Sequence, residues 1–209
     1  MADSTPVAMR PCCGDAHERH GEAAPLLGAE MPRLIPADEA LPIAALPARF
    51  PANTARHEIG HALATILLGG TVGKITIEGQ PCAECRLPDS ARWRHRVAVD
   101  LAGDAATVGE LADPELLWHL AAVRNCGGGH CDRCNATRQI VVGLRHPPDE
   151  DVIAEFRRIE AVLAEFFERR DVRFIVADLA MWLSDDRTIT GNEITERFGS
   201  QIRALKLEI

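Results

Sequence analysis

The chain has 209 residues, of which 46% are hydrophobic and 26% charged, and its formal net charge is −8 at pH 7. This composition supports a packed core and excludes disorder throughout. The acidic balance argues against a general nucleic-acid-binding protein, because no excess of basic residues neutralises phosphates. The sequence has no apolar run of membrane-spanning length and no signal-peptide pattern at its start, which predicts a cytoplasmic protein without a membrane segment.

The first 50 residues are rich in proline. Eight of the 13 prolines lie within the first 51 residues, and proline at this spacing interrupts helices without any alternating pattern that indicates strands. We therefore expect a flexible N-terminal tail over residues 1–50 and one domain over residues 51–209. As an alternative for the end of the tail, the apolar stretch at 41–50 docks on that domain.

The domain is predicted to be mainly α-helical, with one short β-hairpin or small sheet. Hydrophobic periodicity and end signals predict helices at 54–68, 91–111, 114–125, 131–145 and 149–170, with two more before the C-terminus. Residues 72–78 form a β-rich run that predicts a strand, followed by a loop with Cys82 and Cys85. Thr190 and Glu193 fit a capping box for the last helix.

The run His57-Glu58-Ile59-Gly60-His61 carries the clearest chemical signal in the chain. On a helix, histidines four residues apart share a face, and zinc accepts two such imidazoles in tetrahedral geometry. Glu58 can take the proton of a water that zinc acidifies, which is the chemistry of HExxH peptidases. Gly60 costs roughly 1 kcal/mol against alanine inside a helix, so we expect another backbone to approach it closely.

A catalytic zinc site needs a third protein ligand and an open position. Asp132 is the favoured candidate, because it follows three glycines and begins a predicted helix, which leaves its carboxylate at a loop-to-helix junction. Glu110 is the second choice. The other acidic candidates are Glu78, Asp100 and Asp104. The competing interpretation is a chance HExxH sequence with two surface histidines.

Four segments of the sequence resemble the zinc-peptidase domain of the FtsH family of AAA proteases. TARHEIGHALATILLGGTVGKITI resembles the family's HEAGHAL helix and the short strand after it. VAVDLAGDAA resembles its LGGRAAE helix, CDRCNAT its D-x-x-x-A-T segment, and LAMWLSDDRTITGNEI its C-terminal ending. The segments occur in the family's order, and the resemblance covers about residues 52–199.

This resemblance implies a helical zincin-like metallopeptidase fold in which His57, His61 and Asp132 bind zinc and Glu58 is the catalytic base. It implies a zinc-dependent endopeptidase that hydrolyses peptides or unfolded protein segments. It also implies that the strand at 72–78 could be a sheet edge that pairs with an extended substrate.

The chain departs from the family in two respects. Asp104 and Thr107 stand where the family has the Arg and Glu of RAAE, which puts their support of the site in doubt. The chain has no ATPase module, and the run at 69–75 fails the spacing of a phosphate-binding loop. The sequence therefore leaves two questions open: whether a separate unfoldase acts as a partner, and whether the chain forms an oligomer. Two alternatives remain: an inactive zinc-binding regulatory or adaptor protein on the same fold, and a helical interaction domain without metal.

The cysteines form two pairs with the spacing of zinc knuckles, at Cys82, Cys85, Cys131 and Cys134. Together the four thiolates could bind a second, structural zinc. Asp132 lies inside the second pair, so a metal or a disulfide there would hold it in place or withdraw it. The further candidates for this cluster are Cys126 and His130. The alternative is four separate thiols. His95 and His119, on predicted helices, are expected to be surface or hydrogen-bonded core residues.

Overall fold

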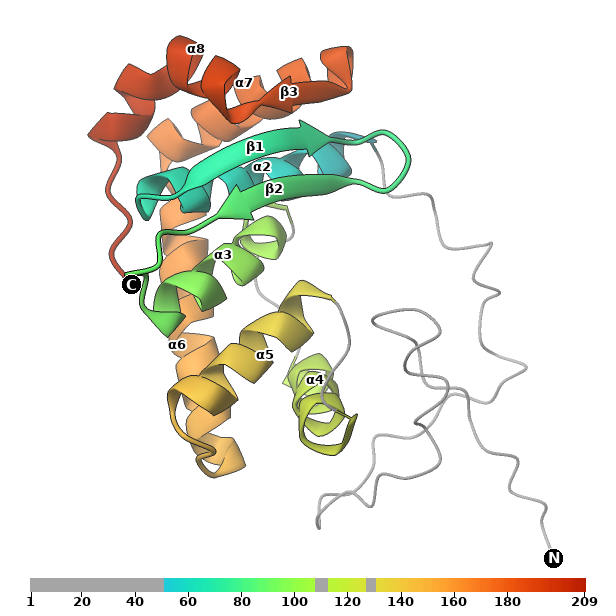
Figure 1. Ribbon diagram of the computed structural model, residues 1–209, viewed down its shortest axis with the longest axis vertical. Helices are drawn as coiled ribbons and strands as arrows, with labels where there is room; N and C mark the ends of the chain where they lie inside the picture. Colours follow the sequence, from blue (N-terminus) through green and yellow to red (C-terminus); the bar gives the residue numbers. More distant parts are fainter. Residues whose placement is uncertain (1–50, 108–112, 127–130) are drawn as a thin grey trace, which may run out of the picture.

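The structure is a computed structural model that describes residues 51–107, 113–126 and 131–209, so the predicted tail at 1–50 lies outside the described residues. The elements are, in chain order, α2 (Pro51–Leu67), β1 (Thr71–Thr76), β2 (Cys82–Arg86), α3 (Trp93–Ala105), α4 (Asp113–Cys126), α5 (Asp132–Gly143), α6 (Asp149–Glu168), α7 (Arg170–Asp186), β3 (Thr188–Thr190) and α8 (Gly191–Ala204). Figure 1 confirms a mainly helical fold with a small sheet. Across these ranges, no helix combines the length and apolarity needed to span a bilayer.

The sheet has three antiparallel strands in the order β2-β1-β3. The expectation that the strand after the first helix is an edge is therefore wrong, since β1 is hydrogen-bonded on both sides. Cys82 and Cys85, predicted in a loop, belong instead to the edge strand β2. The third strand, β3, comes from more than 100 residues further along the chain, with Ile189 opposite Ile75.

The predicted helices are present with shifted ends. The helix expected over 149–170 stops at Glu168, because Arg169 adopts an extended conformation (φ −58°, ψ 134°) from which α7 starts in a new direction. The predicted capping box is confirmed: Thr190 accepts from the Glu193 N–H, and the Glu193 carboxylate accepts from the Thr190 N–H. The helix predicted over 91–111 begins at Trp93 and ends at Ala105, and residues 108–112 lie outside the described residues.

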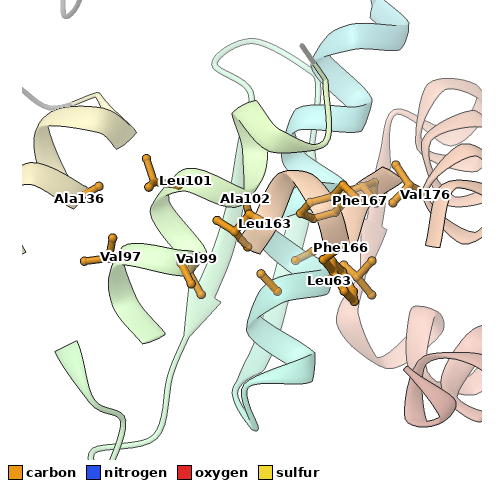
Figure 2. Close-up of a cluster of buried hydrophobic side chains, with 14 of the residues drawn as sticks. Leu63, Val97, Val99, Leu101, Ala102, Ala136, Leu163, Phe166, Phe167 and Val176 are labelled. Carbon is orange, nitrogen blue, oxygen red and sulfur yellow. The ribbon is translucent and has the colours of Figure 1, made fainter. Parts of the chain in front are cut away.

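The core is built around α3 and α6. Figure 2 shows Val97 and Leu101 of α3 directed toward Ala136 of α5, while Phe166 and Phe167 of α6 lie beside α2 and α7. The buried face of α6 follows the predicted helical spacing, and its innermost side chains, Val152, Phe156, Ile159 and Leu163, are fully buried. These contacts fix α3 between α2 on one side and α5 on the other.

The α2 and α3 helices cross at very short range. A Cβ atom on Gly60 would lie 2.4 Å from the Ala102 carbonyl oxygen and 2.8 Å from the Ala106 Cβ. No side chain fits at that separation, so the close backbone approach expected at Gly60 is confirmed. The consequence is that the histidine-bearing face of α2 lies directly against α3.

Candidate metal centre

His57, His61 and Asp132 converge on one point of the structure. The first two come from α2, and Asp132 is the first residue of α5. The His57 Nε2 atom lies 3.1 Å from the Asp132 Oδ2 atom and 3.1 Å from the His61 Nε2 atom, and the remaining His61 Nε2 to Asp132 Oδ2 distance is 3.3 Å. Asp132, which the sequence analysis favoured over the other acidic residues, is thus the carboxylate that joins the two histidines.

The spacing of these three atoms matches one face of a coordination tetrahedron. Nitrogen or oxygen ligands at about 2.0–2.1 Å from a zinc ion, at tetrahedral angles, lie about 3.4 Å from one another. The three observed separations run from 3.1 to 3.3 Å. The donor atoms therefore fit a small cation without rearrangement of the helices.

Contacts on the outer nitrogen of each imidazole orient the two Nε2 atoms inward. The His61 Nδ1 atom lies 2.7 Å from the Val99 carbonyl oxygen, which can only accept, so Nδ1 carries the proton and the neutral ring presents a lone pair at Nε2. On the other ring, the outer nitrogen also faces an acceptor: the His57 Nδ1 atom lies 3.5 Å from the Asp104 Oδ1 atom. The two Nε2 atoms and the Asp132 carboxylate thus meet at one point, an arrangement that suits a cation.

Asp104 supports the site although it is not one of the three convergent residues. Its Oδ2 atom accepts a hydrogen bond of 2.7 Å from Arg133 Nε, which holds the carboxylate behind His57. A carboxylate behind a ligating histidine fixes the ring and raises its basicity. Asp104, which departs from the motif that the sequence resembles, thus still supplies a partner to the site. The Thr107 hydroxyl instead donates to the backbone carbonyls of Gly103 and Asp104.

Without metal, a proton takes the place of the cation. Burial lowers the pKa of His61, but the hydrogen bond and charge of Asp132 and the Val99 carbonyl outweigh it and raise that pKa to about 9. Burial would raise the pKa of Asp132, yet the two histidines hold it well below its usual range. Both pKa shifts favour a protonated His61 paired with an ionised Asp132 in the metal-free protein.

A glycine on α3 makes room for the imidazoles. A Cβ atom on Gly103 would lie 2.4 Å from His61 Nε2 and 2.7 Å from His57 Cε1. Any side chain at Gly103 would occupy the space of the two rings. Sequence reasoning missed this residue; its only signal was a glycine in the interior of a predicted helix, where it costs roughly 1 kcal/mol.

Among the three convergent residues, Asp132 is the most accessible to solvent. The two histidine side chains are 11% exposed, whereas that of Asp132 is 38% exposed. Glu58 is 7% exposed on the same helix, and its charge contributes to the raised pKa of His61, which places it beside the cluster. A metal here would be enclosed by α2 and α3 and accessible from the side of α5.

The remaining acidic candidates do not join the ligand group. Glu78 is exposed in the loop after β1, and Glu110 lies outside the described residues. Asp100 accepts a hydrogen bond from Gln139, and burial together with the charge of Asp132 raises its pKa to about 7. Asp100 therefore lies close enough to sense Asp132 but contributes no atom to the three-donor cluster.

The predicted four-cysteine site is not assembled. Cys82 and Cys85 lie three residues apart on β2, where side chains alternate between faces, so the two thiols point away from each other. Burial raises the pKa of the Cys85 thiol to about 11, which disfavours a nucleophilic thiolate there. Cys131 and Cys134 instead group with His119, a buried residue on α4. Of the further candidates, His130 and the Cys126 side chain lie outside the described residues.

The centre therefore combines two imidazoles and a carboxylate on a shared cation position, a buried glutamate beside it, and solvent access at Asp132. Comparisons with known proteins add no family to this description: no protein-family model matches the chain, and no curated protein sequence matches it.

Proposed function

We propose that this protein is a zinc-dependent metalloendopeptidase of the FtsH-like type, with His57, His61 and Asp132 as zinc ligands and Glu58 as the catalytic base. The observation that carries the proposal is the convergence of the three donor atoms at 3.1–3.3 Å, with both imidazole Nε2 atoms directed at the same point. The resemblance of the surrounding segments to the FtsH peptidase domain points to the same chemistry.

The donor set favours zinc. Imidazole nitrogens suit zinc, and two histidines with one carboxylate leave the fourth tetrahedral position for water or substrate, as in catalytic zinc sites. Zinc held there would supply a Lewis acid that polarises a carbonyl and acidifies water. The solvent access on the side of Asp132 is where that fourth position would open.

Glu58 is suited to move the proton. It lies between the two ligand histidines in sequence and is buried on the same helix, so its carboxylate stays beside the site in a poorly hydrated environment. In hydrolysis it accepts the proton of the attacking water and delivers a proton to the leaving amine. Asp104 holds the ring of His57 in place while this happens.

The substrate we propose is an extended or unfolded segment. In the described part of the sheet, β2 is paired only with β1. Burial is the main cause of the raised pKa of its Cys85 thiol, and the nearby charges of Glu58 and Asp132 add to it. A peptide that adds to the free edge of β2 as a further strand would pass beside the metal centre. Folded substrates would require a separate unfoldase.

Removal of the metal is expected to abolish hydrolysis of unfolded casein. One equivalent of zinc bound by His57, His61 and Asp132, called the first site below, is expected to restore it, because Glu58 acts on water bound to that zinc. The measurement is the casein cleavage rate before chelation, after it and after zinc addition. Cleavage that survives complete removal of metal would contradict the proposal. A zinc-loaded chain that cleaves neither casein nor a peptide library would favour the inactive regulatory or adaptor protein.

The metal-free protein is expected to show His61 titrating near pH 9, and zinc saturation is expected to remove this titration, because the ion replaces the proton. Zinc affinity should then rise by about tenfold per pH unit up to that pKa, since binding releases the His61 proton. NMR of the imidazole carbons, assigned with His61→Ala, measures the midpoint. Asp132→Asn is the control, and this variant should lower the midpoint of the His61 titration. A midpoint near 6.5 in the unaltered chain would be inconsistent with the paired Asp132.

A further inference from the structure

A second cluster of metal donors shares no residue with the His57–His61–Asp132 group. The His119 Nδ1 atom is 3.2 Å from the Cys134 Sγ atom and 3.8 Å from the Cys131 Sγ atom. All three donor atoms lie within 4.8 Å of one another. Cys131 and Cys134 lie in the CDRCNAT segment, but the D-x-x-x-A-T pattern that it resembles specifies neither cysteine, and the proposed hydrolysis does not use them.

The distances fit a tetrahedral ion. With zinc–sulfur bonds of about 2.3 Å and zinc–nitrogen bonds of about 2.0–2.1 Å, a nitrogen and a sulfur ligand lie about 3.6 Å apart. The two observed nitrogen–sulfur separations, 3.2 and 3.8 Å, lie on either side of this value. Two thiolates and one imidazole form a soft donor set that selects zinc over magnesium or calcium.

The surroundings of the cluster are those of a structural site. Cys134 is fully buried and His119 is 3% exposed, so there is little room for a substrate. Hydrogen-bonded thiols around a histidine could produce similar contacts without an ion. In this cluster both sulfur atoms face the same ring nitrogen, His119 Nδ1, so that the imidazole and two thiolates are placed to share one ion.

The two cysteines flank Asp132. Cys131 is the N-cap residue of α5, Asp132 is its first residue, and Cys134 lies in the same turn. His119 comes from α4, which packs against α5. An ion bound by the three residues would therefore fasten the first turn of α5 to α4 on both sides of Asp132.

We propose that His119, Cys131 and Cys134 form a second, structural zinc site that holds Asp132 in position at the first. A fourth donor, water or protein, completes its coordination. The existence of this site does not depend on peptidase activity; its positioning role rests on Asp132 being a ligand of the first site, as in the proposed function.

Cobalt substitution separates the two sites in the full-length chain. Thiolate-bound cobalt(II) gives intense near-ultraviolet charge-transfer absorption, which a site of two histidines and a carboxylate cannot give. We expect two metal equivalents and this absorption in the unaltered chain. The double variant Cys131→Ser/Cys134→Ser should retain one equivalent and lose the absorption, whereas His57→Ala/His61→Ala should retain it. An unaltered chain without the absorption would overturn the second site, whether or not it cleaves peptides.

Zinc affinity at the first site tests whether the second site holds Asp132 in position. We expect His119→Ala to weaken zinc binding at the first site by about 10-fold or more, the usual effect of losing outer support of a ligand. His119→Cys, which restores a donor, should recover both the second metal and the first-site affinity. The matched controls are His95→Ala and Cys82→Ser, in residues outside both clusters. Chelator competition measures the affinities. First-site affinity equal in His119→Ala and the unaltered chain would overturn the positioning role, and this comparison stands even if the double cysteine variant fails to fold.

Discussion

Glu58→Gln is expected to lower the kcat for peptide hydrolysis by about 10³-fold while zinc content stays the same. The amide has nearly the shape of the carboxylate but cannot take a proton from water. Glu58 is not one of the three convergent donors, so its loss should leave the His57–His61–Asp132 cluster intact. Zinc content by elemental analysis and casein cleavage, measured on the same preparation, test both halves of the prediction.

Glu78→Gln is the matched control for this experiment. Glu78 undergoes the same chemical change, but it is exposed in the loop after β1 and outside the donor cluster. We expect it to keep both zinc and activity. Equal activity in Glu58→Gln and the unaltered chain would assign the cleavage to another site or to a contaminant. Loss of zinc in Glu58→Gln would mean that Glu58 helps to hold the ion.

The parts of the fold that depend on local sequence were predictable. The helix that carries His57 and His61 and the capping box of α8 follow from residue spacing within one or two turns. The strand β3 could not be predicted in this way, because its three residues form a strand only by pairing with β1, more than 100 residues earlier in the chain. The same pairing makes β1 central, which no pattern within 72–78 could indicate.

The residues of the candidate metal centre divide in the same way. The two histidines are set by the four-residue repeat of a helix, so their proximity follows from the sequence directly. Asp132 was singled out by its place after three glycines and by the family resemblance, not by any contact with α2. The support from Asp104 and the space made by Gly103 depend on how closely α3 packs on α2. That packing distance is a tertiary property.

The cysteines show where spacing misleads. A pair of cysteines separated by two residues brings both thiols to one side in a turn or at a helix start, as at Cys131 and Cys134. The identical spacing on β2 sends them to opposite faces. His119 could have been found only by knowing that α4 packs on α5, since it precedes Cys131 by 12 residues without a motif of its own.

Gly103→Ala is expected to weaken zinc binding at the first site by about 100-fold or more, at the upper end of effects produced by residues outside the ligands. The new methyl carbon would lie 2.4 Å from His61 Nε2 and 2.7 Å from His57 Cε1, so one or both rings must move. The interfering atoms belong to packed imidazoles held by Val99 and Asp104, which leaves them little freedom to turn aside. Zinc titration with a competing chelator measures the effect.

Gly199→Ala separates this steric effect from the helix propensity of alanine. Gly199 is also inside a helix, but the nearest atom to an added Cβ would be the end of the flexible Arg203 side chain, at 3.2 Å. Alanine there should raise the free energy of unfolding by up to about 1 kcal/mol and leave zinc affinity unchanged. Gly103→Ala gains the same propensity, so thermal unfolding without metal reports any general damage. Unaltered zinc affinity in Gly103→Ala would place the ion away from the two imidazole Nε2 atoms, and the peptidase proposal would lose its geometric basis.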